Sequence, residues 1–272
     1  MKKIAFTKMQ GAGNDFAVIE HAKGNLRALA QKMCHRKFGI GADGILVLGK
    51  SKKTDYRMRI FNSDGSEAEM CGNGVRCLAS YIVRNKNPKK KIFGIETLAG
   101  IIYCEAKNGV AQAHLSAPKN YASNITLNIF GRALKVNFID TGVPHAVVFV
   151  DSLEKIDVER IAPQIRWHKK FAPRGANVNF VEQVGKNFIN VRTFERGVEG
   201  ETLACGTGSV ASAAIAFLKA NPNAQNAKQI VKVLTKGGET LLVTVELING
   251  KVQNVWLKGK TDFVSEGVYY DD

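Results

Sequence analysis

The sequence predicts an α+β protein built from two similar halves. Two observations carry this prediction: a long internal repeat, and, in each half, the same succession of short apolar strands followed by a helix. A chain of 272 residues with 45% hydrophobic residues can also bury a substantial core. Fibrous and disordered protein classes are therefore excluded.

The repeat consists of three successive segments in each half. Ala42 and Cys71 in the first half are separated by the same 29 residues as Ala176 and Cys205 in the second. A further echo starts each half, with Gly11 to Ile19 matching Asp140 to Val150. The corresponding segments are GADGILVL (41–48), DYRMRIFNSDG (55–65) and MCGNGVRCLASYIV (70–83), against GANVNFVE (175–182), NFINVRTFERG (187–197) and ACGTGSVASAAIAFL (204–218).

One helix is expected to begin at each Cys-Gly-x-Gly segment. The first has a single apolar stripe, and the second, Val210 to Leu218, is apolar nearly all round. The second helix should therefore lie buried inside its own sheet. The residues of the stripe are Leu78, Ala79, Ile82 and Val83.

Further strands are indicated by short runs rich in β-branched residues between turn residues. The last two of these runs flank Asn249-Gly250, a pair typical of a two-residue β-hairpin turn. The predicted strands are Ile92 to Ile95, Ile101 to Ala106, Val231 to Leu234, Leu241 to Leu247 and Val252 to Leu257.

The formal net charge of +15 makes a nucleic-acid-binding module the main rival class. The distribution of the charge argues against it, because the one dense basic run, Lys86 to Lys91, contains a proline and is typical of a solvated loop. No helix-turn-helix, RNP or zinc-finger pattern is present. We therefore expect a small-molecule partner and no nucleic acid.

Membrane and secretory classes are also disfavoured. No apolar run reaches the roughly 18–20 residues that a bilayer span needs, and Lys8 interrupts the N-terminal segment before a secretory h-region could form. Five widely spaced cysteines do not resemble a disulfide framework. The sequence predicts reduced thiols, no membrane partner and a cytoplasmic location.

Cys71 and Cys205 occupy equivalent places in the repeat, each directly before a Gly-x-Gly segment and the predicted start of a helix. Unpaired backbone N–H groups and the helix dipole at such a place favour a thiolate. The same N–H groups can hold a carboxylate. If the halves act on one anion, two helix N-termini and two sulfur atoms serve a single site.

This combination suits inversion at a carbon that carries a carboxylate. One thiolate removes a proton from one face, and the other thiol returns a proton to the opposite face. The α-C–H bond of an amino acid is far less acidic than a thiol of pKa ~8.5, so the charge that develops on the carboxylate must be stabilised. Pre-aligned N–H donors stabilise such charge by ~3–4 kcal/mol each in oxyanion holes.

Plainer interpretations exist for each of these residues. A single cysteine before a glycine is ordinarily a small buried residue, and only the duplication favours catalysis. Cys77 lies six residues after Cys71, which is poor spacing for a metal site. Cys34 and Cys104 are predicted to be packing residues. A Gly-x-Gly without a third glycine and an acidic partner is a weak nucleotide signal.

The chain resembles the diaminopimelate epimerase family in its motifs and in their order. The resemblance implies an α+β fold of two pseudo-symmetric domains, each with strands wrapped around a central helix, and an active site in the cleft between them. The implied domains are residues 1–117 plus 262–272 and residues 118–261, with the C-terminus packed on the first. The motifs are KMQGAGNDF, GIGADG, FNSDGSEAEMCGNGVRC, TGVPH, RGANVNF and FERGVEGETLACGTG.

The resemblance implies an isomerase that converts LL-2,6-diaminoheptanedioate to the meso isomer by two-base epimerisation, in lysine and peptidoglycan precursor biosynthesis. It implies no cofactor, no metal and a possible homodimer. Cys71 and Cys205 would be the acid–base pair, with His145 and Glu195 tuning the thiols. The implied substrate-binding residues are Asn14, Asn62, Gly72, Asn73, Asn177, Glu195, Arg196, Gly206 and Thr207.

Two positions depart from the family pattern. Val143 stands where many relatives carry Asn, and Gly44 where some carry Gln, so one amide contact to the distal end of the substrate is missing from the pattern. Proline racemases also use two cysteines, which leaves a racemase of another amino acid as the alternative function. Asn73 and the Glu195-Arg196 pair favour the diamino diacid.

Overall fold

The protein is described from a computed structural model that covers residues 2–21 and 24–271. The chain forms two compact units: unit 1 is Met1–His114 with Lys258–Asp272, and unit 2 is Leu115–Leu257. The boundaries that the sequence predicts, 117/118 and 261/262, lie slightly further along the chain.

Within its described residues, unit 1 has two helices that pack against a set of strands. Helix α1 is Leu26–Cys34 and helix α2 is Gly72–Lys86. The strands are β1 (Lys2–Gly11), β2 (Asn14–Glu20), β3 (Gly44–Gly49), β4 (Tyr56–Asn62), β5 (Glu67–Ala68), β6 (Phe93–Thr97), β7 (Gly100–Lys107), β8 (Val110–Leu115) and β18 (Asp262–Asp271).

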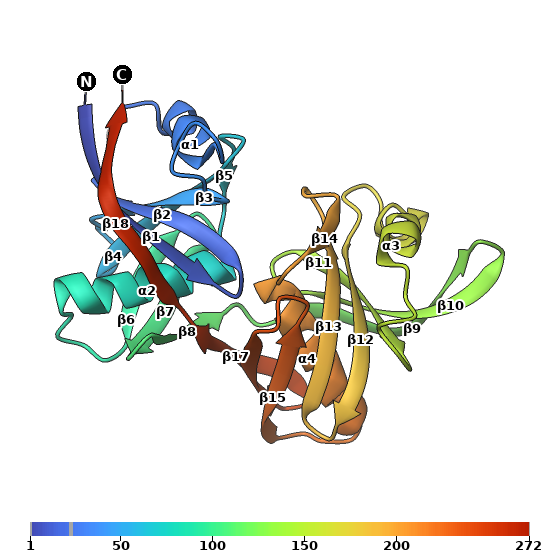
Figure 1. Cartoon of the computed structure of the whole chain (residues 1–272). Helices are drawn as coiled ribbons and strands as arrows, with labels where there is room; N and C mark the ends of the chain where they lie inside the picture. Colours follow the sequence, from blue (N-terminus) through green and yellow to red (C-terminus); the bar gives the residue numbers. More distant parts are fainter. Residues whose placement is uncertain (1, 22–23, 272) are drawn as a thin grey trace. The chain divides into compact units, whose positions relative to one another are not determined.

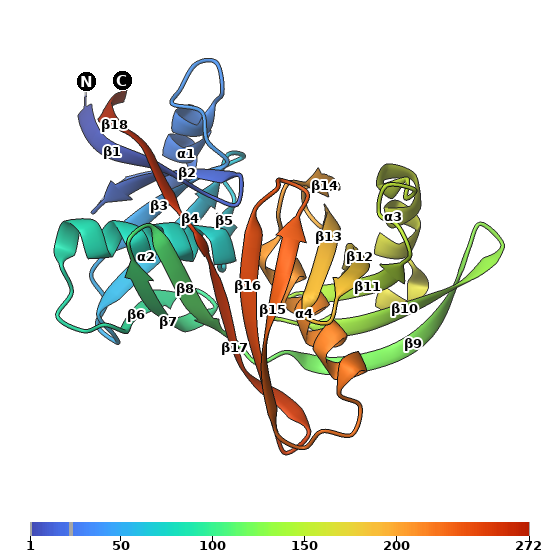
Figure 2. The same cartoon turned by 60° about the horizontal axis from the view of Figure 1, so that its bottom comes forward.

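The strands of unit 1 surround α2, which contacts β1, β2, β3, β4 and β7 (Figure 2). Pairing runs from β18 through β1, β2, β3, β4, β6 and β7 to β8, with parallel steps at β2–β3 and β4–β6. The two ends of the chain lie side by side, because Lys2 pairs with Asp271 (Figure 1). The C-terminus thus packs on the first unit, as the resemblance implies.

Unit 2 repeats this plan. Its helices are α3 (Val158–Arg166), the 3₁₀ turn η1 (Lys169–Phe171) and α4 (Gly206–Ala220). Its strands are β9 (Lys119–Ile129), β10 (Arg132–Asp140), β11 (Pro144–Val150), β12 (Asn177–Gly185), β13 (Phe188–Glu195), β14 (Gly200–Thr202), β15 (Ala227–Thr235), β16 (Thr240–Ile248) and β17 (Lys251–Lys260), which crosses the unit boundary.

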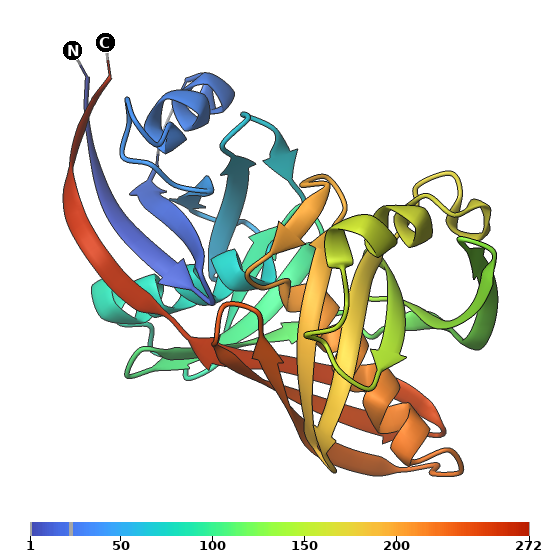
Figure 3. The same ribbon diagram turned by 45° about the vertical axis from the view of Figure 1, so that its right-hand side comes forward.

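Strands of unit 2 also surround a helix, since α4 contacts β10, β11, β12, β13, β15 and β16 (Figure 3). Strands β11 and β12 run parallel, as do β13 and β15, and the other pairings are antiparallel. Helix α4 is buried along almost its whole length, from Gly206 to Phe217. Its Ala-rich composition lets strands approach from every side, which confirms the predicted buried helix.

The duplication extends to side-chain contacts. In unit 1, Arg59 on β4 makes two hydrogen bonds with Glu67 on β5, at 2.7 and 2.9 Å. In unit 2, Arg192 on β13 binds Glu201 on β14 in the same way, at 2.6 and 2.9 Å. In each unit, the pair joins a long strand to the short strand that comes next in the chain, and the Cys-Gly segment follows that short strand.

The helices α1 and α3 are additions to the predicted pattern. Each begins at a short polar cap: Asn25 Oδ1 accepts from Ala28 N, and Asp157 Oδ1 accepts from Arg160 N. Each buries one apolar face, so a second helix packs on the outside of the sheet in both units.

Most of the predicted elements are confirmed, including the strands and the hairpin at Asn249-Gly250, where both residues have positive φ. The basic run from Lys86 to Lys91 is an exposed helix end and loop, and Cys34 and Cys104 are buried. The single-stripe description of α2 is wrong. Buried residues run continuously from Gly72 to Ile82, because strands cover the helix on several sides.

Within the described residues, no helix is long and apolar enough to cross a bilayer.

Candidate active site

Cys71 caps the N-terminus of α2. Its backbone is extended, and its Sγ accepts a hydrogen bond from Gly74 N at 3.5 Å. Val75 N donates to Cys71 O, the first bond of the helical ladder. The N–H groups of Gly72 and Asn73 therefore have no partner inside the helix and lie at its positive end.

A buried guanidinium lies beneath this helix start. Arg76 is fully buried, and its side chain donates to Gly72 O at 3.2 Å and to Asn73 Oδ1 at 3.1 Å. These bonds fix the backbone of the first turn and the orientation of the Asn73 amide. Burial raises the pKa of Cys77 to about 12, although the Arg76 charge acts in the opposite direction. Cys77 is thus a neutral packing residue.

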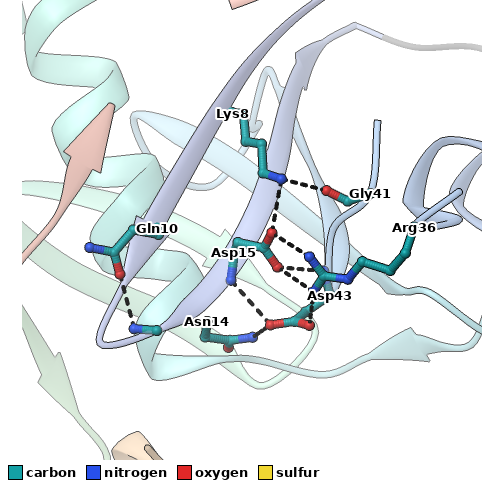
Figure 4. A network of polar contacts seen from close by, with 8 residues as sticks. Lys8, Gln10, Asn14, Asp15, Arg36, Gly41 and Asp43 are labelled. Atoms are coloured by element: carbon teal, nitrogen blue, oxygen red, sulfur yellow. Dashed lines mark hydrogen bonds and ion pairs between the residues drawn. The ribbon is translucent and has the colours of Figure 1, made fainter. Parts of the chain in front are cut away.

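Asn14, at the start of β2, also contacts Cys71, one of the two candidate acid–base thiols. The Cys71 thiol donates to Asn14 Oδ1 at 3.6 Å, while Asn14 Nδ2 donates to Asp43 Oδ2 at 2.6 Å. Figure 4 shows Asn14 and Asp43 as part of a larger polar network that includes Asp15, Arg36 and Lys8.

Two other positions in unit 1 were singled out from the sequence. Asn62, at the end of β4, is exposed, and its Nδ2 donates to Ser66 Oγ at 2.9 Å. Gly44 lies in the β3–β4 pairing, where an added Cβ would be only 2.6 Å from the carbonyl oxygen of Phe61. A larger residue at Gly44 would force these strands apart.

Cys205 caps α4 as Cys71 caps α2. Its Sγ accepts from Gly208 N at 3.4 Å and lies 3.4 Å from Thr207 Oγ1. Ser209 N donates to Cys205 O, which leaves the N–H groups of Gly206 and Thr207 without a partner inside the helix. Cys205 is the more buried of the two thiols, with 6% of its surface exposed.

Behind Cys205 lies a buried neutral network. His145 is fully buried, and its Nδ1 is 3.1 Å from Asn179 Nδ2. Asn179 Oδ1 in turn accepts from Thr193 Oγ1 at 3.0 Å. Burial, together with the charge of Arg196, lowers the pKa of His145 to about 3, so the imidazole is neutral near pH 7. A Cβ added at Gly208 would collide with Asn179 Oδ1.

Asn177 orients the segment that carries the candidate distal-site residues. Its Oδ1 accepts from Arg196 N at 2.8 Å, and its Nδ2 donates to Pro144 O at 3.2 Å. Glu195, at the end of β13, accepts from Thr202 Oγ1 at 3.1 Å. The backbone of Arg196 and the carboxylate of Glu195 are thus held in place at one strand end.

Arg196 lies in a strongly positive environment. Its pKa is lowered by burial and by the neighbouring charges of Arg166 and Arg174. Glu199 binds Arg166 at 2.9 Å and accepts from Gly197 N at 3.0 Å, so one carboxylate offsets part of this charge. Such a half-buried cationic group is suited to an anionic ligand.

Within each unit, the structure brings some of the predicted site residues together and leaves others apart. Asn14, Gly72 and Asn73 lie around Cys71, whereas Asn62 belongs to the neighbouring β4–β5 turn. In unit 2, Gly206 and Thr207 adjoin Cys205, and Asn177 joins Arg196. Among the described residues, no three His, Cys, Asp or Glu side chains are grouped as metal ligands would be.

Sequence reasoning missed three residues that shape these groups: Arg76, Asn179 and Asp43. Arg76 is a charge inside an otherwise apolar helical run, which could have drawn attention to it. Asn179 follows Asn177 by two residues, so both project from the same face of β12. Asp43 lies in the GIGADG motif, but its role depends on contacts with residues distant in the sequence, such as Asn14.

The sequence matches the family described as "Diaminopimelate epimerase" over residues 6–114 and 137–262. A protein of that name from Methanocella arvoryzae is 50% identical over 234 residues, covering 79% of this chain and 82% of its own. Another from Carboxydothermus hydrogenoformans is 41% identical over 285 residues, covering 98% of this chain and 100% of its own.

Solved structures with the same fold are more distant in sequence. A Bacillus anthracis phenazine biosynthesis protein of the PhzF family has a TM-score of 0.77 at 19% identity and covers 100% of both chains. A probable proline racemase from Agrobacterium radiobacter has a TM-score of 0.71 at 14% identity, covering 99% of this chain and 93% of its own.

Proposed function

This chain belongs to the diaminopimelate epimerase family, and from that premise we propose that it interconverts LL- and meso-2,6-diaminoheptanedioate through the two thiols described above. The observation that carries the proposal is the duplicated cap: Cys71 and Cys205 each accept from the third N–H of a helix whose first two N–H groups lack a helical partner. The reaction is an isomerisation, as in lysine biosynthesis.

By the family pattern, the reacting carboxylate is assigned to backbone N–H groups at the helix starts. In unit 1 these belong to Gly72 and Asn73, and in unit 2 to Gly206 and Thr207. As the α-proton leaves, negative charge moves onto this carboxylate. Donors that the helix holds in place before substrate binds stabilise such charge with little reorganisation, by ~3–4 kcal/mol each in comparable oxyanion holes.

The thiols supply the base and the acid. One accepts the α-proton of the substrate, and the other donates its S–H proton to the opposite face of the same carbon, so configuration is inverted. The protonation states are exchanged at the end of the turnover and are exchanged again in the reverse reaction. His145 is neutral and is linked through Asn179 to the turn at Gly208, so we assign it to positioning Cys205.

The distal end of the substrate needs a cation for its carboxylate and an anion for its ammonium group. Arg196 and Glu195 provide these charges, and Asn177 orients Arg196 through its backbone. Asn14 and Asn62 are assigned to amide contacts with the distal end by the family pattern. Val143 removes one such contact. Homodimer assembly, a cytoplasmic location and the domain bounds taken from the sequence stay predictions.

The experiment that tests this function uses single alanine variants of each thiol. Cys71→Ala and Cys205→Ala should each reduce epimerisation of LL-2,6-diaminoheptanedioate by at least ~10³-fold, because no other group replaces the lost acid or base. Turnover is measured by chromatography that separates the stereoisomers. Full activity in either variant would contradict the two-thiol reaction.

Cys77→Ala is the matched control. Cys77 lies in the same helix as Cys71 but is fully buried, and its removal leaves only a small cavity. This variant should retain activity within about tenfold. A panel containing proline and other amino acids, assayed with the unmodified protein, separates the proposed substrate from that of an amino-acid racemase.

A further inference from the structure

Asp43 lies where the loop after α1 enters β3, and it is in contact with the residue that faces Cys71. Its Oδ2 accepts from Asn14 Nδ2 at 2.6 Å and from Asp15 N at 3.1 Å. The carboxylate therefore holds the amide of Asn14 by its nitrogen (Figure 4).

Asp43 is itself held in place on several sides. Arg36 donates to Asp43 Oδ1 at 2.7 Å and binds both carboxylate oxygens of Asp15, at 2.8 and 2.9 Å. Asp43 N donates to Asp15 Oδ1 at 3.0 Å, and Lys8 bridges Asp15 and Gly41 O. Burial would raise the pKa of Asp15, but the bonds from Arg36 and Lys8 outweigh it and lower that pKa.

This network decides which end of the Asn14 amide meets the sulfur. A carboxylate can only accept, so it binds Nδ2 and leaves Oδ1 on the other side. There Oδ1 lies 3.6 Å from Cys71 Sγ and accepts the S–H. A carbonyl oxygen in this position stabilises the thiol, whereas an amide N–H would stabilise the thiolate.

We propose that Asp43 is a positioning residue which, by holding Asn14, keeps Cys71 in its protonated form before substrate binds. Cys71 then starts as the acid of the pair. The inference rests on the proposed function only for its effect on turnover, because the protonation of Cys71 can be measured without substrate. The carboxylate of Asp43 does not touch the reacting atoms.

Other groups of unit 1 also act on Cys71. Gly74 N and the positive end of α2 favour the thiolate, as does the Arg76 guanidinium, which binds the next residue, Gly72. Cys77 on α2 lies in the same region and is neutral, because burial raises its pKa. Asp262 on β18 carries a negative charge, which also raises the pKa of Cys77. Cys104 on β7 is buried and neutral. The hydrogen bond to Asn14 therefore acts against Gly74 N, the positive end of α2 and Arg76, which favour the thiolate.

The test is the pH dependence of Cys71 alkylation by iodoacetamide in the free enzyme, read peptide by peptide by mass spectrometry. Asp43→Asn keeps the shape but lets the amide of Asn14 turn. At pH values below the midpoint of Cys71 ionisation, Cys71 should react roughly twofold to tenfold faster in the variant than in the unmodified protein, since one hydrogen bond to the thiol is lost. Cys205 is the internal reference, and its rate should not change.

Removing a negative charge near a thiol also lowers its pKa, so the charge effect needs its own control. Asp15→Asn removes a charge from the same network but leaves the Asn14–Asp43 bond in place, and should change the Cys71 rate less. In an Asn14→Ala background, Asp43→Asn should retain only the smaller effect of the lost charge. An equal acceleration with and without Asn14 would overturn the positioning role.

Two controls distinguish failure of this inference from loss of structure and from failure of the proposed function. Loss of structure in Asp43→Asn would expose Cys77, so an unchanged, slow alkylation of Cys77 shows that the first turns of α2 remain folded. If Cys71→Ala kept full epimerase activity, the proposed function would fail while the alkylation shift could still stand. An unchanged Cys71 midpoint in intact Asp43→Asn would contradict the inference alone.

Discussion

The two units hold their cysteines with the same backbone but surround them with different chemistry. In unit 1, the helix behind Cys71 contains the buried cation Arg76, and the flanking strands carry the charged network around Asp43. In unit 2, position 210, which corresponds to Arg76, is a valine inside an apolar helix, and the polar groups behind Cys205 are the neutral His145 and Asn179.

The register of the paired strands identifies which residues of the two units correspond. Phe16 pairs with Gly44 on parallel strands, and Ala146 pairs with Val178 in the same way, so Asp15 corresponds to His145 and Asp43 to Asn177. Both units have the helix-capping thiol. The polar side chains behind it are charged in unit 1 and neutral in unit 2. A two-base reaction needs unlike protonation states at its two thiols, and unlike surroundings provide them.

The largest stability effect is expected at the buried cation. Arg76→Met removes the donors to Gly72 O and Asn73 Oδ1 and should lower the free energy of unfolding by about 3 kcal/mol, since two buried acceptors lose their partner. Urea unfolding measures this. Val210→Ala at the equivalent place should cost only about 1–2 kcal/mol. Equal losses would show that Arg76 contributes packing rather than polar support.

The next largest effect is a pH dependence of the free energy of unfolding, which we expect from unit 2 and not from unit 1. His145 has a pKa of about 3 in the folded protein against 6.5 unfolded, so below pH 6.5 the unfolded chain binds the extra proton. Stability present above pH 6.5 is then lost as the pH falls, by about 2 kcal/mol at pH 5. Urea unfolding of His145→Gln should show a flatter profile between pH 6.5 and 4.

Asp15→Asn is the comparison variant for this profile, because Asp15 occupies the equivalent position in unit 1. Its lowered pKa means that its contribution is present above 3.8 and lost only as the pH falls below that value. Asp15→Asn should therefore leave the slope between pH 6.5 and 4 intact. A slope that survives His145→Gln unchanged would contradict burial of a neutral imidazole.

The smallest effect concerns the duplicated ion pair. The side chain of Glu201 is 5% exposed and binds Lys236 as well as Arg192, whereas that of Glu67 is 16% exposed and binds Arg59. Glu201→Gln should cost about 1–2 kcal/mol and Glu67→Gln about 0.5–1 kcal/mol, because the more buried pair is less screened by solvent. Thermal unfolding of the two variants checks the order.

The sequence was sufficient for the parts of the fold that local pattern and duplication determine. Alternating strands, the Asn249-Gly250 hairpin and the buried α4 follow from residue periodicity, and both cysteines follow from the repeat. Helices α1 and α3 were missed because they are short, and their Asn25 and Asp157 caps lie in segments without a matching repeat motif.

The second layer of the site could not be predicted in the same way. Arg76, Asn179 and Asp43 act through partners that are placed by strand pairing, and the neutral state of His145 depends on complete burial. The family resemblance supplied the site residues but not the orientation of the Asn14 amide. That orientation depends on Arg36, which lies in no motif of the site, and on Asp15, which follows Asn14 in KMQGAGNDF but was given no role from the sequence.

The most direct test of the two-thiol reaction is the early time course in deuterium oxide. With unlabelled LL-2,6-diaminoheptanedioate, the first meso product should carry deuterium at the inverted carbon, while the remaining substrate stays unlabelled, because the group that removes the proton does not return it. Mass spectrometry of the separated isomers gives both values. Product that keeps its original hydrogen, or substrate that gains label at the same rate as product, would contradict the account.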